Sequence, residues 1–242
     1  MYEGDRVPLR SSKPSEATVY GRYGIAALGA DRRKNKPFPK NKHKPDNYEV
    51  NELYYDLDEK KNYLKEHLSP KRYQHSLNVA AECRKLAEKY GEDTDKAYFA
   101  GLLHDVCKEL PEDEQRKLAE NDVFAACREE LETRSLLHAV AGAYFVKTNF
   151  GVEDIDILNS IRFHTVGRAG MSRLEEIVYL GDLVSADRDY KDVDKMRRIV
   201  YTDLNDAMLE AFIFAIKSVI KKGGLVPPCT LEGYNFYTRL KK

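Results

Sequence analysis

Four histidines and two aspartates of this 242-residue chain stand among small and apolar residues. Residues 100–110, AGLLHDVCKEL, show the pattern most clearly, because His104 and Asp105 directly follow two leucines. Burying a polar or charged side chain is costly unless a partner compensates for the lost water. The full set is His75, His104, Asp105, His138, His164 and Asp182. The pattern predicts that each of these residues has a buried partner.

A metal site is the partner that suits this set best. A single histidine on an apolar helix face is more often a hydrogen-bonded core residue than a ligand. Four histidines on separate helices, together with two aspartates, are harder to explain in that way. Imidazole and carboxylate ligands suit hard or borderline divalent metals. Because the set contains no thiolate, it favours iron or manganese, or another divalent ion, over structural zinc.

The number of ligands predicts two metals rather than one. Neighbours on a helix point about 100° apart, so His104 and Asp105 meet one ion only if the helix passes it side-on. Asp105 can then offer its second oxygen to another ion. We expect a first set, His75, His104, Asp105 and Asp182, to hold one metal. A second set, His138, His164 and the bridging Asp105, would hold the other.

Helices must position these residues, and from residue 48 onward the chain shows helical spacing with no rival alternating pattern. Ser69 and Pro70 start one helix, and Gly91 ends it. Further helices are expected over residues 94–110, 112–120, 133–148, 153–163 and 172–186, the last opened by a capping box of Ser172 and Glu175. Two more helices end near residue 221, and a closing tail follows. The predicted fold class is therefore all-α.

The first 47 residues differ from the rest of the chain. Residues 1–50 hold 11 Lys or Arg and 6 Asp or Glu, a net charge of +5, and 5 of the 9 prolines. No apolar period is visible there, which is typical of a poorly structured tail. The alternative is a nucleic-acid-binding arm. We therefore divide the chain into a basic tail, residues 1–47, which we favour as a solvated segment, and a helical domain, residues 48–242.

Composition excludes several classes of protein. The four cysteines are scattered and form no CxxC pair, which argues against a disulfide framework and for a reducing, cytoplasmic setting. No apolar run approaches the roughly 18 residues that span a bilayer. The first residues contain no apolar segment of the kind found in secretory signals. We expect a cytoplasmic globular protein with no membrane partner.

The ordered series His75, His104-Asp105, His138, His164 and Asp182 resembles the HD-domain superfamily of metal-dependent phosphohydrolases. The stretches HDVCK, HAVAGAYFV and HTVGRAGM resemble one branch closely, the symmetrical bis(5'-nucleosyl)-tetraphosphatases. The resemblance covers roughly residues 57–240. It differs at Ser185 and Ala186, where this branch usually has Glu-Pro.

This resemblance implies an HD-domain helical bundle with a buried di-iron site. The implied reaction is the hydrolysis of diadenosine tetraphosphate to two ADP, by a hydroxide held between the two metals. Asp105 and Lys108 would serve catalysis. The alternative is another HD-domain nucleotide phosphohydrolase, acting on a nucleoside mono- or triphosphate or on a guanosine alarmone. A homodimer is compatible with either activity.

A polyphosphate substrate also requires cations near the metals. Lys108 lies four residues after His104, and Arg168 lies in the loop after His164, where Thr165 and Gly167 would shape the backbone. Arg188 follows Asp182 and is a third candidate. For Lys108, the alternative is a favourable interaction with a helix C-terminus. For Arg168, it is a plain surface turn.

Overall fold

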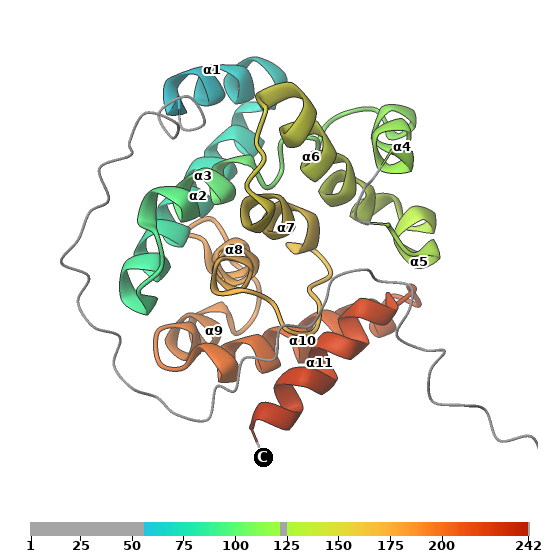
Figure 1. Cartoon of the computed structure of the whole chain (residues 1–242). Helices are drawn as coiled ribbons and strands as arrows, with labels where there is room; N and C mark the ends of the chain where they lie inside the picture. Colours follow the sequence, from blue (N-terminus) through green and yellow to red (C-terminus); the bar gives the residue numbers. More distant parts are fainter. Residues whose placement is uncertain (1–55, 122–124, 242) are drawn as a thin grey trace, which may run out of the picture. The chain divides into compact units, whose positions relative to one another are not determined.

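In the computed structural model, which describes residues 56–121 and 125–241, every regular element is an α-helix. Figure 1 shows α7 at the centre of the view, with α3, α6 and α8 around it. The predicted basic tail, residues 1–47, lies outside the described residues, and so does the alternative of a nucleic-acid-binding arm. The helices are α1 (Leu57–His67), α2 (Pro70–Tyr90), α3 (Thr94–Leu103), α4 (Glu112–Glu120), α5 (Arg128–Glu132), α6 (Arg134–Phe150), α7 (Ile155–Phe163), α8 (Arg173–Val184), α9 (Val193–Val200), α10 (Leu204–Lys221) and α11 (Pro228–Leu240).

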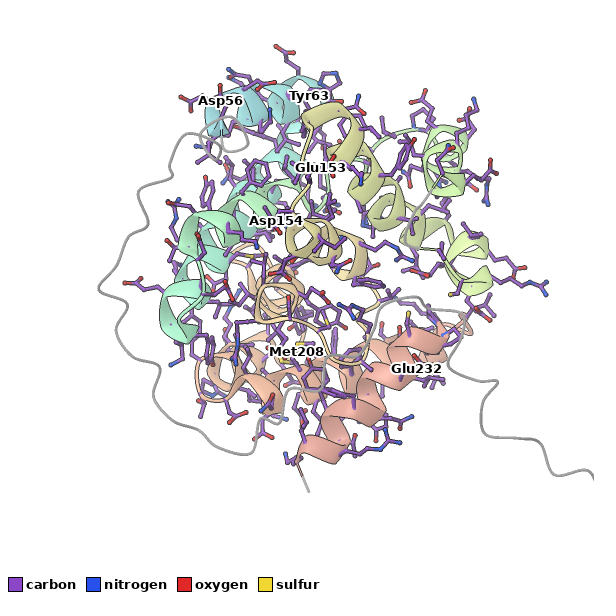
Figure 2. The ribbon with its side chains drawn as sticks, viewed as in Figure 1. Asp56, Tyr63, Glu153, Asp154, Met208 and Glu232 are labelled. Atoms are coloured by element: carbon purple, nitrogen blue, oxygen red, sulfur yellow. The ribbon has the colours of Figure 1, made fainter. Side chains whose placement is uncertain are left out.

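Local sequence signals set the ends of several helices. The Ser69 side chain accepts a hydrogen bond from the backbone N–H of Arg72 at the start of α2, and Gly91 ends that helix with a φ of 72°. Asp154, labelled in Figure 2, caps α7. Its carboxylate also pairs with Lys96 of α3 at 2.8 Å. These caps fix the first turns of two helices that deliver histidines to the site.

Two predicted boundaries are wrong, and the first has a consequence for chemistry. The helix expected over 94–110 ends at Leu103, and residues 104–109 form successive turns. The ring Nδ1 of His104 lies 2.7 Å from the carbonyl oxygen of Gly101, the acceptor that an unbroken helix would give to the N–H of Asp105. The expected closing tail is instead the helix α11, which starts at Pro228.

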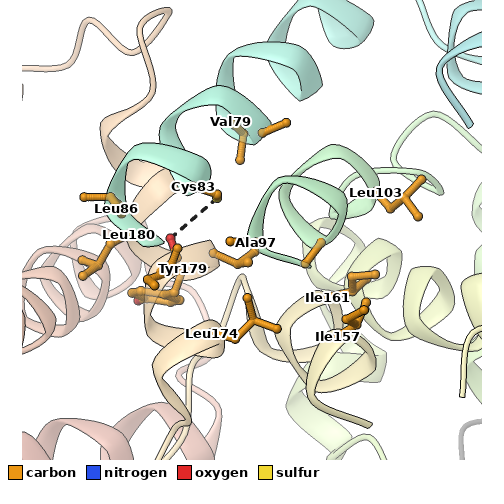
Figure 3. Close-up of a cluster of buried hydrophobic side chains, with 14 of the residues drawn as sticks. Val79, Cys83, Leu86, Ala97, Leu103, Ile157, Ile161, Leu174, Tyr179 and Leu180 are labelled. Carbon is orange, nitrogen blue, oxygen red and sulfur yellow. Dashed lines mark hydrogen bonds between the residues drawn. The ribbon is translucent and has the colours of Figure 1, made fainter. Parts of the chain in front are cut away.

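Small residues bring the helices of the site together. An added Cβ on Gly101 of α3 would lie 2.8 Å from the sulfur of Cys83 on α2, and one on Gly181 of α8 would lie 2.6 Å from it. Figure 3 shows Cys83 at this junction, with its thiol directed at the carbonyl of Ile177, 3.7 Å away. Gly101 precedes His104 by three residues and Gly181 adjoins Asp182. The close packing therefore fixes the distance between two predicted ligands.

The last two helices brace the loop that follows α7. The ring of Phe212, on α10, lies between Gly167 of this loop and Gly233 of α11, where added Cβ atoms would approach it to 2.5 and 2.4 Å. Gly167 has a φ of 62°, a conformation that favours glycine. The Thr230 hydroxyl of α11 donates to the carbonyl of Val166 at 2.8 Å. The loop that begins at His164 is therefore packed against the C-terminal helices.

Replacing Gly233 by alanine tests this packing. We expect Gly233→Ala to lower the free energy of unfolding by about 1–3 kcal/mol, because the new methyl group overpacks against Phe212. Gly142→Ala on α6 is the matched control, since its Cβ would meet nothing closer than 3.4 Å. Denaturant unfolding of both variants measures the difference. Equal stability of the two variants would contradict this packing.

Candidate metal centre

All six predicted ligands meet in one cluster, in which five are buried and Asp182 is partly exposed. His75 comes from α2, His138 from α6 and Asp182 from α8. His104 and His164 occupy the C-terminal caps of α3 and α7. The centroids of neighbouring imidazole rings lie 5.3 Å apart for His75 and His104, 4.9 Å for His104 and His164, and 5.1 Å for His138 and His164. Five elements thus converge on one point.

The two oxygens of Asp105 divide this cluster between the two predicted sets. Oδ2 lies 3.8 Å from Nε2 of His75 and 3.5 Å from Nε2 of His104. Oδ1 lies 3.0 Å from Nε2 of His138 and 3.6 Å from Nε2 of His164. Asp182 belongs on the Oδ2 side, because its Oδ1 lies 3.0 Å from Nε2 of His75. One carboxylate therefore faces both sets.

The donor atoms at the centre suit a metal. Among the described residues, the buried Nε2 of His75, Nε2 of His104 and Oδ1 of Asp105 have no hydrogen-bond partner. Such orphaned atoms are rare inside proteins unless an ion or water completes them. Two groups bring their ligand atoms within 4.8 Å of one another: His75, His104 and Asp182, and His104, Asp105 and His164. Nitrogen and oxygen donors without sulfur match divalent metals of the iron and manganese class.

The charge states also suit metal binding. Burial would raise the pKa of Asp105, but His104 and the neighbouring imidazoles of His138 and His164 hold this pKa well below its usual range. Burial lowers the pKa of His138 to about 4, against the opposing effect of Asp105. Burial also lowers the pKa of His164. At neutral pH the second set therefore presents a carboxylate and two neutral imidazoles, the forms that bind metals.

Three cations surround the two carboxylates, and sequence reasoning missed one of them. Arg72 Nη1 donates to Oδ2 of Asp105 at 2.7 Å. Arg188 donates to Oδ1 of Asp182. Lys108 Nζ lies 3.1 Å from Nε2 of His138, although the turns after Leu103 replace the helix that was expected to carry it. Arg72 precedes His75 by one helical turn, so its i, i+3 spacing was a usable signal.

Arg168 takes a different place from the other predicted phosphate contacts. Its guanidinium donates to the buried carboxylate of Glu175 at 2.5 Å and lies over the ring of Phe163, 5.0 Å from the centroid. Burial raises the pKa of Glu175 to about 7 despite the charge of Arg168. Thr165 has a buried hydroxyl with no partner among the described residues. A phosphate contact at Arg168 stays a prediction.

A third carboxylate near His75, that of Asp187, was absent from the sequence analysis. Asp187 Oδ2 lies 2.7 Å from Nδ1 of His75. Its Oδ1 accepts hydrogen bonds from Asn78 and from Ser185, each at 3.0 Å. Burial raises the pKa of Asp187, but Asn78 and His75 outweigh it and lower the value to about 2. No local pattern signals this contact, because the two residues are 112 positions apart.

A cavity of about 830 Å³ opens beside the cluster. Lys108 and His138 line it on the side of the metal centre, and Gly223, Gly224 and Leu225 line it from the turn between α10 and α11. The start of α6, including Thr133 and Ser135, also contributes. The volume lies within the range of small-molecule sites.

Comparisons with known proteins identify related chains. Residues 72–187 match the HD domain family. The symmetrical bis(5'-nucleosyl)-tetraphosphatase of Halalkalibacterium halodurans is 39% identical over 177 residues, which are 71% of this chain and 91% of that protein. The protein of the same name from Bacillus subtilis is 35% identical over 173 residues, or 72% and 92% of the two chains.

A solved structure has a similar fold. The crystal structure of a predicted HD superfamily hydrolase involved in NAD metabolism, from Clostridium acetobutylicum, has a TM-score of 0.74 and 40% sequence identity. The match covers 77% of this chain and 98% of that one. Among the described residues, no helix is long and apolar enough to cross a membrane.

Removing Asp105 tests the geometry of the cluster. Asp105→Ala should reduce bound metal to below about one ion per chain, because both sets lose their shared ligand. Metal analysis of protein purified without oxygen measures this, and circular dichroism should show the helices retained. Asp113→Ala, an exposed carboxylate on α4, is the control. Retention of two tightly bound ions in Asp105→Ala would contradict a bridging role.

Proposed function

The chain belongs to the HD-domain family, alongside the symmetrical bis(5'-nucleosyl)-tetraphosphatases, and on that basis we propose that it hydrolyses diadenosine tetraphosphate to two ADP. The observation that carries the proposal is the division of one buried carboxylate between two ligand sets. Oδ2 of Asp105 faces His75 and His104, and Oδ1 faces His138 and His164. This arrangement supports a two-metal hydrolase.

Six residues would hold two divalent ions, with iron as our first choice and manganese as the second. When bound, two such ions supply an activated water and positive charge for the phosphate oxygens. The side chains of this chain keep the ligand nitrogens in place. Nδ1 of His104 lies 2.7 Å from the carbonyl oxygen of Gly101, and Nδ1 of His164 lies 2.7 Å from that of Ile161. Donation to those carbonyls leaves both Nε2 atoms directed at the centre.

The cations would then bind the polyphosphate chain. Arg72, Lys108 and Arg188 lie around the two carboxylates, at the place where negative charge would accumulate during cleavage. Burial lowers the pKa of Lys108, although Asp105 opposes this effect. Guanidinium groups can contact phosphate oxygens in pairs, which suits a four-phosphate chain. Arg168, with Thr165 and Gly167 shaping its loop, is a further proposed contact.

The cavity beside His138 is large enough for one half of the substrate. A symmetrical cut requires the middle of the phosphate chain at the metals and a nucleoside on each side. The cavity of about 830 Å³ begins at Lys108 and His138, so a nucleoside diphosphate moiety could extend from the centre into it. This placement supports recognition of the substrate by more than its phosphates.

A different HD-domain nucleotide phosphohydrolase remains the second candidate, because the metal core would be the same. A nucleoside mono- or triphosphate or a guanosine alarmone would then be the substrate. The cytoplasmic setting, the homodimer and the role of the basic tail stay predictions.

Product analysis tests the proposed function. The metal-loaded protein should convert diadenosine tetraphosphate to ADP alone, and far faster than it cleaves AMP, ADP or a simple phosphodiester. In oxygen-labelled water, the label should enter the β-phosphate of one of the two ADP molecules. Chromatography with mass spectrometry measures both. Formation of AMP plus ATP would contradict the symmetrical cut, and release of pyrophosphate or triphosphate from other nucleotides would favour the second candidate.

Substitution of the cations tests their assignment. Arg72→Ala and Lys108→Ala should keep metal but lose about 2–4 kcal/mol of transition-state stabilisation, the usual cost of removing a preorganised charged contact. Lys117→Ala, an exposed lysine on α4, should have no effect. Steady-state kinetics measures the loss of transition-state stabilisation, and metal analysis shows whether the ions are retained. Unchanged kinetics in Arg168→Ala would contradict a phosphate contact and leave Arg168 with its contact to Glu175 alone.

A further inference from the structure

His75 differs from two other histidines of the cluster in what its outer nitrogen meets. Nδ1 of His104 and Nδ1 of His164 each lie 2.7 Å from a backbone carbonyl three residues earlier. Nδ1 of His75 instead lies 2.7 Å from Oδ2 of Asp187, a carboxylate 112 residues further along the chain. One ligand nitrogen is thus backed by a full negative charge, and two are backed by neutral dipoles.

This difference has a chemical consequence for His75. A carboxylate is a stronger acceptor than a carbonyl, so it holds the proton on Nδ1 and fixes the tautomer whose lone pair is on Nε2. Nε2 of His75 lies 3.0 Å from Oδ1 of Asp182 and faces the centre. The negative charge on the far side of the ring also increases the basicity of Nε2.

Asp187 is itself held in place by two neighbours. Its Oδ1 accepts from Nδ2 of Asn78 and from the hydroxyl of Ser185, each at 3.0 Å. Asn78 lies one turn after His75 on α2, and Ser185 is fully buried at the end of α8. The two carboxylate oxygens of Asp187 therefore have different partners. Oδ1 accepts hydrogen bonds from Asn78 and Ser185, and Oδ2 contacts the imidazole of His75. These contacts fix the carboxylate of Asp187, although its side chain is 36% exposed.

We propose that Asp187 is a positioning residue that sets the affinity of the first metal position through His75, with Asn78 and Ser185 as its supports. The inference rests on the proposed metal site and not on the identity of the nucleotide substrate. It also gives Ser185 a role, because this residue stands where the resemblance led us to expect a glutamate. In this chain Ser185 donates to Asp187, the acid two residues later.

Metal binding measured without nucleotide tests this proposal. The full chain is depleted of metal and titrated with Co(II), whose absorption spectrum reports ligation, and competition with a chelator gives the two dissociation constants. Asp187→Ala should weaken one of the two binding steps by about 10–100-fold, the usual effect of losing such a partner. Asp187→Asn, which keeps an acceptor oxygen without the charge, should fall between Asp187→Ala and the unchanged protein.

Asp189→Ala is the matched control, an exposed aspartate of the same segment, and should leave both constants unchanged. Long-range ¹⁵N–¹H spectra should show the His75 proton on Nδ1 in the unchanged protein, and a mixture of tautomers in Asp187→Ala. Equal metal affinities in Asp187→Ala and Asp189→Ala would overturn the proposal.

A milder variant, Asn78→Ala, tests the proposal if Asp187→Ala does not fold. Asn78→Ala removes one support of Asp187 and should weaken the same binding step by a smaller factor. No change in that step in a folded Asn78→Ala protein would then overturn the proposal. Because these measurements contain no nucleotide, they are independent of the hydrolysis test. A protein that showed the Asp187 effect but did not cleave diadenosine tetraphosphate would contradict the proposed function only.

Discussion

The buried carboxylate of Asp105 is the interaction on which the rest of the site depends. It is 3% exposed and lies among four imidazoles, which would be an unfavourable position for an isolated charge. The structure compensates with Arg72 on Oδ2 and with imidazoles around both oxygens. The carboxylate oxygens of Asp105 can bind either kind of cation, a metal ion or a guanidinium group. Arg72 and Lys108 therefore lie around Asp105, and Arg188 lies against Asp182.

The geometry around Asp105 depends on where helices stop. α3 ends at Leu103, and the turns that follow direct His104 and Asp105 to one centre, which an unbroken helix would hold about 100° apart. His164 likewise follows the last residue of α7. In both rings Nδ1 lies at hydrogen-bonding distance from a backbone carbonyl oxygen of the preceding turn. The same contact therefore accompanies the end of the helix and orients the imidazole ring. Gly101 and Gly181 allow the carrier helices to approach Cys83 closely enough for the ligands to meet.

Local signals made the fold class and the family resemblance predictable, and the structure and the comparisons bear out both. The six predicted ligands lie close together in the structure, and their role as ligands stays a prediction. A polar residue in an apolar helical segment can be seen from its neighbours, as at His138 and Asp182. Arg72 could have been found as well, since it lies one turn before His75. Asp187 could not, because only the folded chain brings it to His75. The course of α11 was missed because its half-exposed, proline-led sequence shows no strong helical stripe.

The C-terminal helices belong to the site although they lie outside residues 72–187, the part that matches the HD domain family. The Thr230 hydroxyl of α11 donates to the carbonyl of Val166, two residues after the predicted ligand His164. Phe212 of α10 fills the space beside Gly167, where a side chain would collide with it. The turn between the two helices also lines the cavity that begins at His138. All six predicted ligands lie within residues 72–187, but the loop beside the second predicted set and one wall of the cavity depend on α10 and α11. A change in α10, in α11 or in the turn between them can therefore alter this loop and this wall of the cavity without any change at the six predicted ligands.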